Sequence, residues 1–307
     1  MALGEFELIY QYFSSYGAGA AVQLGVGDDC AVLSVPEGDQ LVASVDTMVE
    51  GRHFTEAAFP EDVAFRSVAA AASDLAAMGA RPLGMTLALT VPDADELWLH
   101  AFSEGVGRAV TAFDLPLVGG DTTRGALTIS VQVFGAVPAG QALLRSGAGP
   151  GDRLCVSGFL GDAAAGLALE QGTSTFELSD IEYLSQRFYR PTPRLTLGQS
   201  LLGTATACID ISDGLLADVV HLAQASGVAV SIESSRVPLS PALRRLQNSE
   251  QALRWALTGG DDYELCFTLP SAAALPPHCT VIGKIEAGEG VDCDLALGAP
   301  PGFDHFA

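Results

Sequence analysis

Glycine–aspartate steps recur at the ends of apolar segments, and this repetition restricts the fold more than any other feature of the sequence. The steps are Gly27-Asp28-Asp29, Gly119-Gly120-Asp121 and Gly259-Gly260-Asp261-Asp262, and a further acidic pair after an apolar segment is Asp210 and Asp213. Glycine permits close backbone approach, and aspartate supplies the short oxygen ligand that magnesium prefers. A single glycine–aspartate step is more often only a turn. Their repetition at strand ends instead favours a site for several magnesium ions.

Several acids interrupt otherwise apolar segments. LGVGDDCAVL, residues 24–33, predicts a strand, a glycine turn and a second strand, and neighbouring carboxylates are costly to bury there without a cation. Asp74 lies near the end of an apolar helix, where its charge opposes the helix dipole and a capping role does not apply. Asp46 interrupts an apolar strand. The alternation of side chains along that strand would place Asp46 either on the solvent face or at the magnesium site. Magnesium held by few carboxylates takes its other ligands from water and phosphate, which points to a nucleotide substrate.

The charge balance argues against nucleic acid and anionic lipid as partners. The chain has 37 acidic and 15 basic residues, a net charge of -22, whereas nucleic-acid binders need a basic surface. Solubility alone is an alternative reason for this acidity. No apolar run reaches the length of a membrane span, and MALGEFELIY lacks the basic start of a signal peptide. The scattered cysteines contain no CxxC pair, so we expect reduced core residues in a cytoplasmic protein.

The predicted elements mix strands and helices in both halves of the chain. We expect short strands within 22–60, a helix over 60–78, a strand over 85–91 and a helix from Pro92-Asp93 with Glu96 completing a capping box. The segment RSGAGPGD, residues 145–152, is the best domain boundary. Beyond it, a strand ends at Asp210, and Ser212 or Asp213 caps a helix that Gly227 closes. The sequence therefore predicts an α+β fold with two domains, 1–145 and 146–307.

Two common ways of holding nucleotides are missing from the sequence. No GxxxxGK[ST] loop occurs, and Lys284 is the only lysine, with none of the motifs that surround a protein-kinase lysine. Phosphate charge would then be met by magnesium, by arginines such as Arg145 and by glycine-rich backbone N–H groups.

Short segments along the chain occur in the order and spacing of one known family. They are GEFELI, GVGDDCAVL, SVDTMVEGRHF, SDLAAMGARP, LVGGDTTRG, RSGAGPGD, RPTPR, IDISDGL and GGDDYEL. Each is weak alone, but the ordered set, from Gly4 to about Phe303, closely resembles the thiamine-monophosphate kinase family. That family shares a superfamily with aminoimidazole ribonucleotide synthetase and selenophosphate synthetase. The resemblance implies a homodimer whose N-terminal α/β domains bind metal and ATP and pair strands across the dimer, with the C-terminal α+β domain completing the active-site cleft.

The resemblance also implies a set of site residues. Magnesium is expected at Asp29, Ser44, Val45, Asp46, Asp74, Asp121 and Asp210, with a further ion at Asp213. ATP is expected at Gly120, Asp121, Arg145 and Ser212, and the thiamine substrate at His53, Asp261 and Phe303. The family often has GGEDYEL, so Asp261 is one methylene shorter than the usual glutamate. Asp28 is expected to be a turn residue or a partner of Asp29.

The implied reaction transfers a phosphoryl group directly and in line from ATP to thiamine monophosphate. The attacking phosphate oxygen is already anionic, so no general base is expected, and catalysis rests on positioning and charge neutralisation. Selenophosphate synthetase would need a reactive cysteine or selenocysteine that residues 1–22 lack, and the purine enzyme would lack GRHF together with GGDDYEL. A non-catalytic sensor of ATP or divalent cations is the alternative from another class. The presence of both metal and substrate motifs argues against it.

Overall fold

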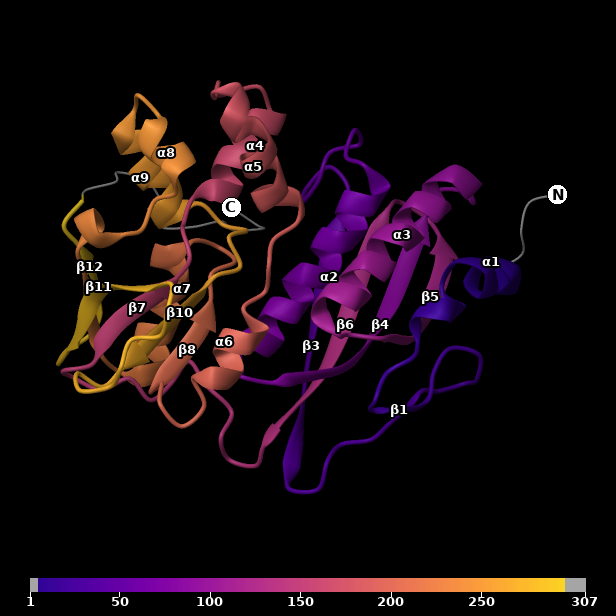
Figure 1. Cartoon of the computed structure of the whole chain (residues 1–307), viewed down its shortest axis with the longest axis horizontal. Helices are drawn as coiled ribbons and strands as arrows, with labels where there is room; N and C mark the ends of the chain where they lie inside the picture. The colour runs from indigo at the N-terminus through magenta and orange to yellow at the C-terminus, as the bar shows by residue number, and fades with distance from the viewer. Residues whose placement is uncertain (1–4, 296–307) are drawn as a thin grey trace. The chain divides into compact units, whose positions relative to one another are not determined.

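The computed structural model describes residues 5–295 and divides the chain into two compact units, each mixing helices and strands (Figure 1). The first unit runs to Leu75 and resumes over Ala80–Gly140, whereas the second holds Ala76–Gly79 and the residues from Gln141 onward. The expected domain boundary at residue 145 therefore falls within the second unit. The expected α+β class is confirmed, because neither unit has a regular alternation of parallel strands and helices.

The first unit is built on a four-stranded sheet with the order β3-β6-β4-β5. Its helices are α1 (Glu5–Tyr12), the short η1 (Ser14–Tyr16), α2 (Pro60–Ala77) and α3 (Glu96–Phe113). Its strands are β1 (Val22–Leu24), β2 (Val32–Leu33), β3 (Asp39–Val49), β4 (Arg81–Val91), β5 (Leu117–Arg124) and β6 (Thr128–Pro138), of which β1 and β2 form a separate antiparallel pair. Helices α2 and α3 lie along one face of the sheet (Figure 1). They approach closely at Gly105, where a Cβ atom would overlap the backbone of Glu61.

Strand β3 is an edge strand with two different faces. Its even-numbered residues include the buried Met48, which accepts a hydrogen bond from Ser67 of α2 at 3.4 Å. Its odd-numbered residues face away, and Leu41, Val45 and Val49 are 53%, 60% and 37% exposed. A long edge strand with exposed apolar side chains is a surface that usually needs covering.

The second unit contains a six-stranded sheet with the order β12-β9-β11-β7-β10-β8. Its strands are β7 (Arg153–Ser157), β8 (Ala207–Asp210), β9 (Ala229–Ile232), β10 (Leu265–Leu269), β11 (Cys279–Glu286) and β12 (Gly290–Cys293). Its helices are α4 (Asp162–Glu170), α5 (Leu178–Tyr189), α6 (Leu195–Ser200), α7 (Leu215–Ser226), η2 (Ser234–Arg236), α8 (Pro241–Arg245) and α9 (Ser249–Thr258). Alternate residues of β7 enter two different cores, Leu154 and Val156 one and Cys155 the other, so both faces of this sheet are covered.

Two expected helix starts are wrong. Helix α3 begins at Glu96, because Asp95 is its N-cap and its carboxylate accepts the N–H groups of Leu97 and Trp98. Helix α7 has Gly214 at its N-cap and no side-chain cap, so neither Ser212 nor Asp213 caps it. Its end at Gly227, which has a left-handed backbone, is as expected.

The cysteines are unpaired as expected, but they are not all in the core. Cys155, Cys208 and Cys266 are buried, and burial raises the pKa of Cys155 to about 12. Cys30 is exposed, so the expectation of a core position is wrong there. It lies in the loop between β1 and β2, where the chain has no packed layer to enter.

Candidate functional site

The first unit contains a cavity of about 1180 Å³ where two of the glycine–aspartate steps meet. Asp28 and Asp29, from the loop joining β1 to β2, line it together with Gly120 and Asp121 of β5. Asp28 Oδ1 accepts the backbone N–H of Asp29 at 2.8 Å, which makes Asp28 a turn residue. Both of these aspartates are exposed, so the cost of burial that the sequence suggested does not arise.

Gly120 is required by the local backbone. Its φ is 155°, and a Cβ atom at this position would overlap the carbonyl oxygen of Leu87 on the neighbouring strand β4. Substitution would therefore push β5 away from β4.

Ser44 and Asp74 are brought together from β3 and α2. The Ser44 hydroxyl donates to Asp74 Oδ2, although the two residues are 30 positions apart in the chain. Asp46 has the same strand parity as Ser44, so it lies on the face toward α2 and not on the fully exposed face. Asp74 is only partly buried, which corrects the expectation of a buried carboxylate. The Val45 side chain is on the opposite, exposed face, so only its backbone could share a ligand with Ser44.

His53 follows β3 and has a defined ring orientation. Its Nδ1 accepts the backbone N–H of Val49 at 3.0 Å, so the neutral ring carries its proton on Nε2. Arg66 of α2 donates to the His53 carbonyl oxygen at 2.8 Å. These two contacts hold both the ring and the backbone of the GRHF segment.

In the second unit, the acids at the end of β8 surround a tightly bonded turn. Asp210 is 5% exposed, and the turn that follows carries Ser212 and Asp213. Asp218 Oδ2, from α7, accepts the backbone N–H groups of Ser212, Asp213 and Gly214 at 3.1, 3.2 and 3.2 Å. The Asp218 carboxylate thus binds the backbone N–H groups of the turn that leads into α7.

Neighbouring acids at this turn influence the ionisation of Asp218. Burial, and then the negative charges of Asp210 and Asp213, raise the pKa of Asp218 to about 8. A cation bound by Asp210 or Asp213 would offset this repulsion, and carboxylate oxygens are the donors that magnesium prefers. Among residues 5–295 no three His, Cys, Asp or Glu side chains stand close enough to form a complete metal site.

The turn after β8 is bonded to the loop before β10. The N–H groups of Asp261 and Tyr263 donate to the carbonyl oxygens of Ser212 and Ile211, each at 2.9 Å. Gly260 lies so close to Ser212 that a Cβ atom would overlap its carbonyl oxygen. Two residues of different expected roles, Ser212 for ATP and Asp261 for the substrate, are therefore neighbours.

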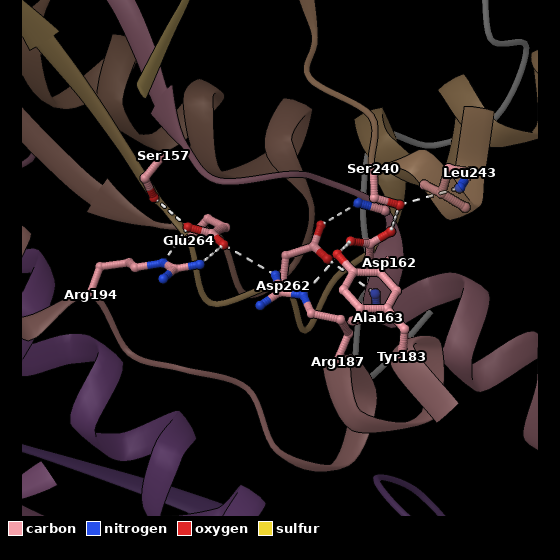
Figure 2. Close-up of polar contacts among 11 residues, drawn as sticks. Ser157, Asp162, Ala163, Tyr183, Arg187, Arg194, Ser240, Leu243, Asp262 and Glu264 are labelled. Carbon is pink, nitrogen blue, oxygen red and sulfur yellow. Dashed lines mark hydrogen bonds and ion pairs between the residues drawn. The ribbon is translucent and has the colours of Figure 1, made fainter. Parts of the chain in front are cut away.

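A buried polar network lies behind this loop (Figure 2). Glu264, which is 0% exposed, accepts from Ser157, Arg187 and Arg194, and the Arg187 contact measures 3.1 Å. Asp262 accepts the backbone N–H groups of Gly161 and Ala163 at 2.6 and 3.2 Å, at the start of α4.

A third acid, Asp162, completes the network. Its carboxylate accepts from Tyr183 and Ser240, each at 2.6 Å (Figure 2). Burial raises the pKa of Asp262 to about 7 and also raises the pKa of Asp162, while Arg187 opposes both changes. The three acids and two arginines therefore form one compensated group that ties α4 and α5 to the loop before β10.

The two remaining expected site residues are Arg145 and Phe303. Arg145 is exposed in the second unit, where its carbonyl oxygen accepts a hydrogen bond from Ser226 at 3.0 Å. Phe303 lies outside the described residues. The ligand roles expected from the resemblance stay predictions.

Sequence reasoning missed the residues that support the site. The sequence pattern does not single out Asp218, because an aspartate in an amphipathic helix is usually a surface residue. Glu264 and Arg194 stand within GGDDYEL and RPTPR, which had been noticed only as motifs. The opposite charges of these two segments were the available signal for their pairing.

The two units coincide with two known domains, and full-length relatives share one description. AIR synthase related protein, N-terminal domain matches residues 27–137, and AIR synthase related protein, C-terminal domain matches residues 149–295. Thiamine-monophosphate kinase of Escherichia coli K12 is 46% identical over 100% of this chain and 99% of its own. That of Bacillus subtilis 168 is 36% identical over 92% of each.

Solved structures also superpose on this chain. Thiamine-monophosphate kinase from Stenotrophomonas maltophilia superposes with a TM-score of 0.86 at 44% identity, covering 96% of this chain and 98% of that chain. AaThiL complexed with AMPPCP and TMP superposes with a TM-score of 0.82 at 35% identity, covering 89% of each chain. With both domains matched and the relatives covered along their whole length, the chain belongs to the thiamine-monophosphate kinase family.

Proposed function

We propose that this protein phosphorylates thiamine monophosphate with ATP, which yields thiamine diphosphate and ADP in thiamine diphosphate biosynthesis. The observation that carries the proposal is the cavity of the first unit, which is lined by two glycine–aspartate steps, one in the loop between β1 and β2 and one in β5. Full-length similarity to thiamine-monophosphate kinases and to AaThiL, whose structure holds AMPPCP and TMP, supports the choice of substrates.

The residues of the chain position the two phosphate groups and need no general base. Gly120 lines the cavity, where its backbone could contact phosphate, and Arg145 offers an exposed guanidinium. Asp29, Ser44, the Val45 backbone, Asp46, Asp74, Asp121, Asp210 and Asp213 would hold magnesium. When bound, magnesium offsets the charge of the phosphate oxygens. Transfer is direct and in line, since the attacking phosphate oxygen is already anionic.

The proposal includes a homodimer. Edge strand β3 exposes Leu41, Val45 and Val49 on one face, and pairing with a second copy would cover them. Sedimentation of the purified protein is expected to give twice the mass of one chain.

No helix within residues 5–295 is long and apolar enough to cross a membrane. The expected cytoplasmic location stays a prediction.

A turnover assay tests the proposed reaction. Purified protein with ATP, magnesium and thiamine monophosphate is expected to form thiamine diphosphate, which separation of the thiamine esters detects. Samples with free thiamine or without magnesium are the controls and should form none. ATP binding without any diphosphate would favour a nucleotide sensor or a sister enzyme and refute the proposal.

Replacing His53 by alanine is expected to raise the KM for thiamine monophosphate about tenfold, with the KM for ATP changed less than about twofold. The reason is that the ring, which accepts the Val49 N–H at Nδ1, has a fixed orientation for contact with the substrate. Steady-state kinetics with each substrate varied in turn measures the difference. His100→Ala, which removes an exposed histidine of α3 beside Glu104, is the matched control. Equal losses for both substrates would contradict a substrate contact at His53.

A further inference from the structure

The loop before β10 holds two residues in a conformation that few side chains adopt. Asp261 and Tyr263 have left-handed backbones, with φ of 68° and 50°. Such strain persists only where surrounding contacts enforce it, and residues of this kind concentrate at functional sites. The loop is held by contacts on both sides, and its shape brings Tyr263 to Asp261.

Contacts on both sides of the loop enforce its shape. On one side, the N–H groups of Asp261 and Tyr263 bond to the turn after β8. On the other side, the intervening Asp262 points into the buried network, where it accepts the N–H groups of Gly161 and Ala163 (Figure 2). The loop is therefore fixed at every residue from 261 to 263.

The result of this shape is a contact between the two strained residues. Tyr263 Oη donates to Asp261 Oδ1 at 3.1 Å. Tyr263 is 6% exposed, whereas Asp261 is only partly buried. A rigid, buried phenol thus holds a carboxylate that solutes can reach.

We propose that Tyr263 is a positioning residue whose hydroxyl fixes the direction in which the Asp261 carboxylate meets thiamine monophosphate. This inference rests on the proposed function, which assigns Asp261 to the substrate. The thiazolium ring of that substrate is cationic, so an oriented carboxylate attracts it. Because the aspartate side chain is short, its reach is small and its orientation matters more.

The test compares Tyr263→Phe, Asp261→Gly and the double variant with the wild type. Phenylalanine keeps the ring and removes only the hydroxyl, and glycine suits the left-handed backbone at 261. Tyr183→Phe is the matched control, because it removes a hydroxyl that donates to another carboxylate, Asp162, in the same unit. Calorimetry gives the Kd for thiamine monophosphate, and kinetics gives the KM for each substrate.

Tyr263→Phe is expected to weaken thiamine monophosphate binding about tenfold, with the KM for ATP and kcat changed less than about twofold. In the Asp261→Gly background the same substitution should change the Kd less than about twofold, since the carboxylate it orients is gone. Tyr183→Phe should leave the Kd within about twofold of the wild type.

Other outcomes overturn the inference. An unchanged Kd in Tyr263→Phe would do so, as would additive effects in the double variant or equal losses for both substrates. A wild type that binds no thiamine monophosphate would refute both proposals. A wild type that binds it without turnover would refute the proposed reaction alone, and the Kd values would still decide the role of Tyr263.

Discussion

Replacing Asp210 by asparagine is expected to lower magnesium-dependent formation of thiamine diphosphate about a thousandfold, while the fold stays intact. Asp210 is 5% exposed at the end of β8, and asparagine keeps its shape but not its charge. The loss follows from the proposed magnesium site, because a bound metal supplies several kcal/mol of charge stabilisation and about 1.4 kcal/mol corresponds to a factor of ten. The turnover assay measures the rate at saturating ATP and thiamine monophosphate.

Melting curves separate this loss from unfolding. Asp210 repels the buried Asp218 carboxylate, so without magnesium the variant should melt at the wild-type temperature or above it. The rise in melting temperature that magnesium and ATP cause in the wild type should be smaller in the variant. Asp180→Asn is the matched control, since Asp180 is a buried carboxylate of the same unit that pairs with Arg245. Wild-type turnover in Asp210→Asn would show that the metal assignment is wrong.

Replacing Glu264 by glutamine is expected to cost about 3–5 kcal/mol of unfolding free energy. Glu264 is 0% exposed and compensates Arg187 and Arg194, whose side chains are 14% and 30% exposed. Glutamine retains the shape but removes the negative charge that both arginines share, and Arg187 retains the more distant Asp162 carboxylate, at 3.8 Å. An unpaired charge in a buried site carries most of the desolvation cost that the pair had offset.

Urea unfolding followed by circular dichroism measures this change. Asp180→Asn again gives the comparison, because its partner Arg245 is 46% exposed and water can solvate it after the change. The loss in Asp180→Asn should therefore be clearly smaller. Equal midpoints for Glu264→Gln and the wild type would contradict the view that this network supports the loop before β10.

Much of the fold was predictable because it depends on neighbouring residues. The apolar pattern of 60–78 predicted helix α2, Pro60–Ala77, and the glycine between two apolar runs predicted the β1–β2 hairpin. The order of the motifs along the chain was enough to indicate the family, since it needs no knowledge of contacts. The start of α3 was misjudged because Asp93 and Asp95 both suit an N-cap, and only the backbone geometry selects Asp95.

The support of the candidate site depended on contacts that no local pattern encodes. Glu264 meets Arg194 and Arg187 across 70 and 77 residues, and Asp162 meets Ser240 across 78. The sequence by itself determined helix α2, the end of α7 and the family to which the chain belongs, because periodicity, glycine stops and motif order are local properties. Only the tertiary structure decided that the Tyr263 hydroxyl donates to Asp261 and that Asp218 accepts the N–H of Ser212. Those contacts require backbone angles and chain crossings that arise when distant segments pack together.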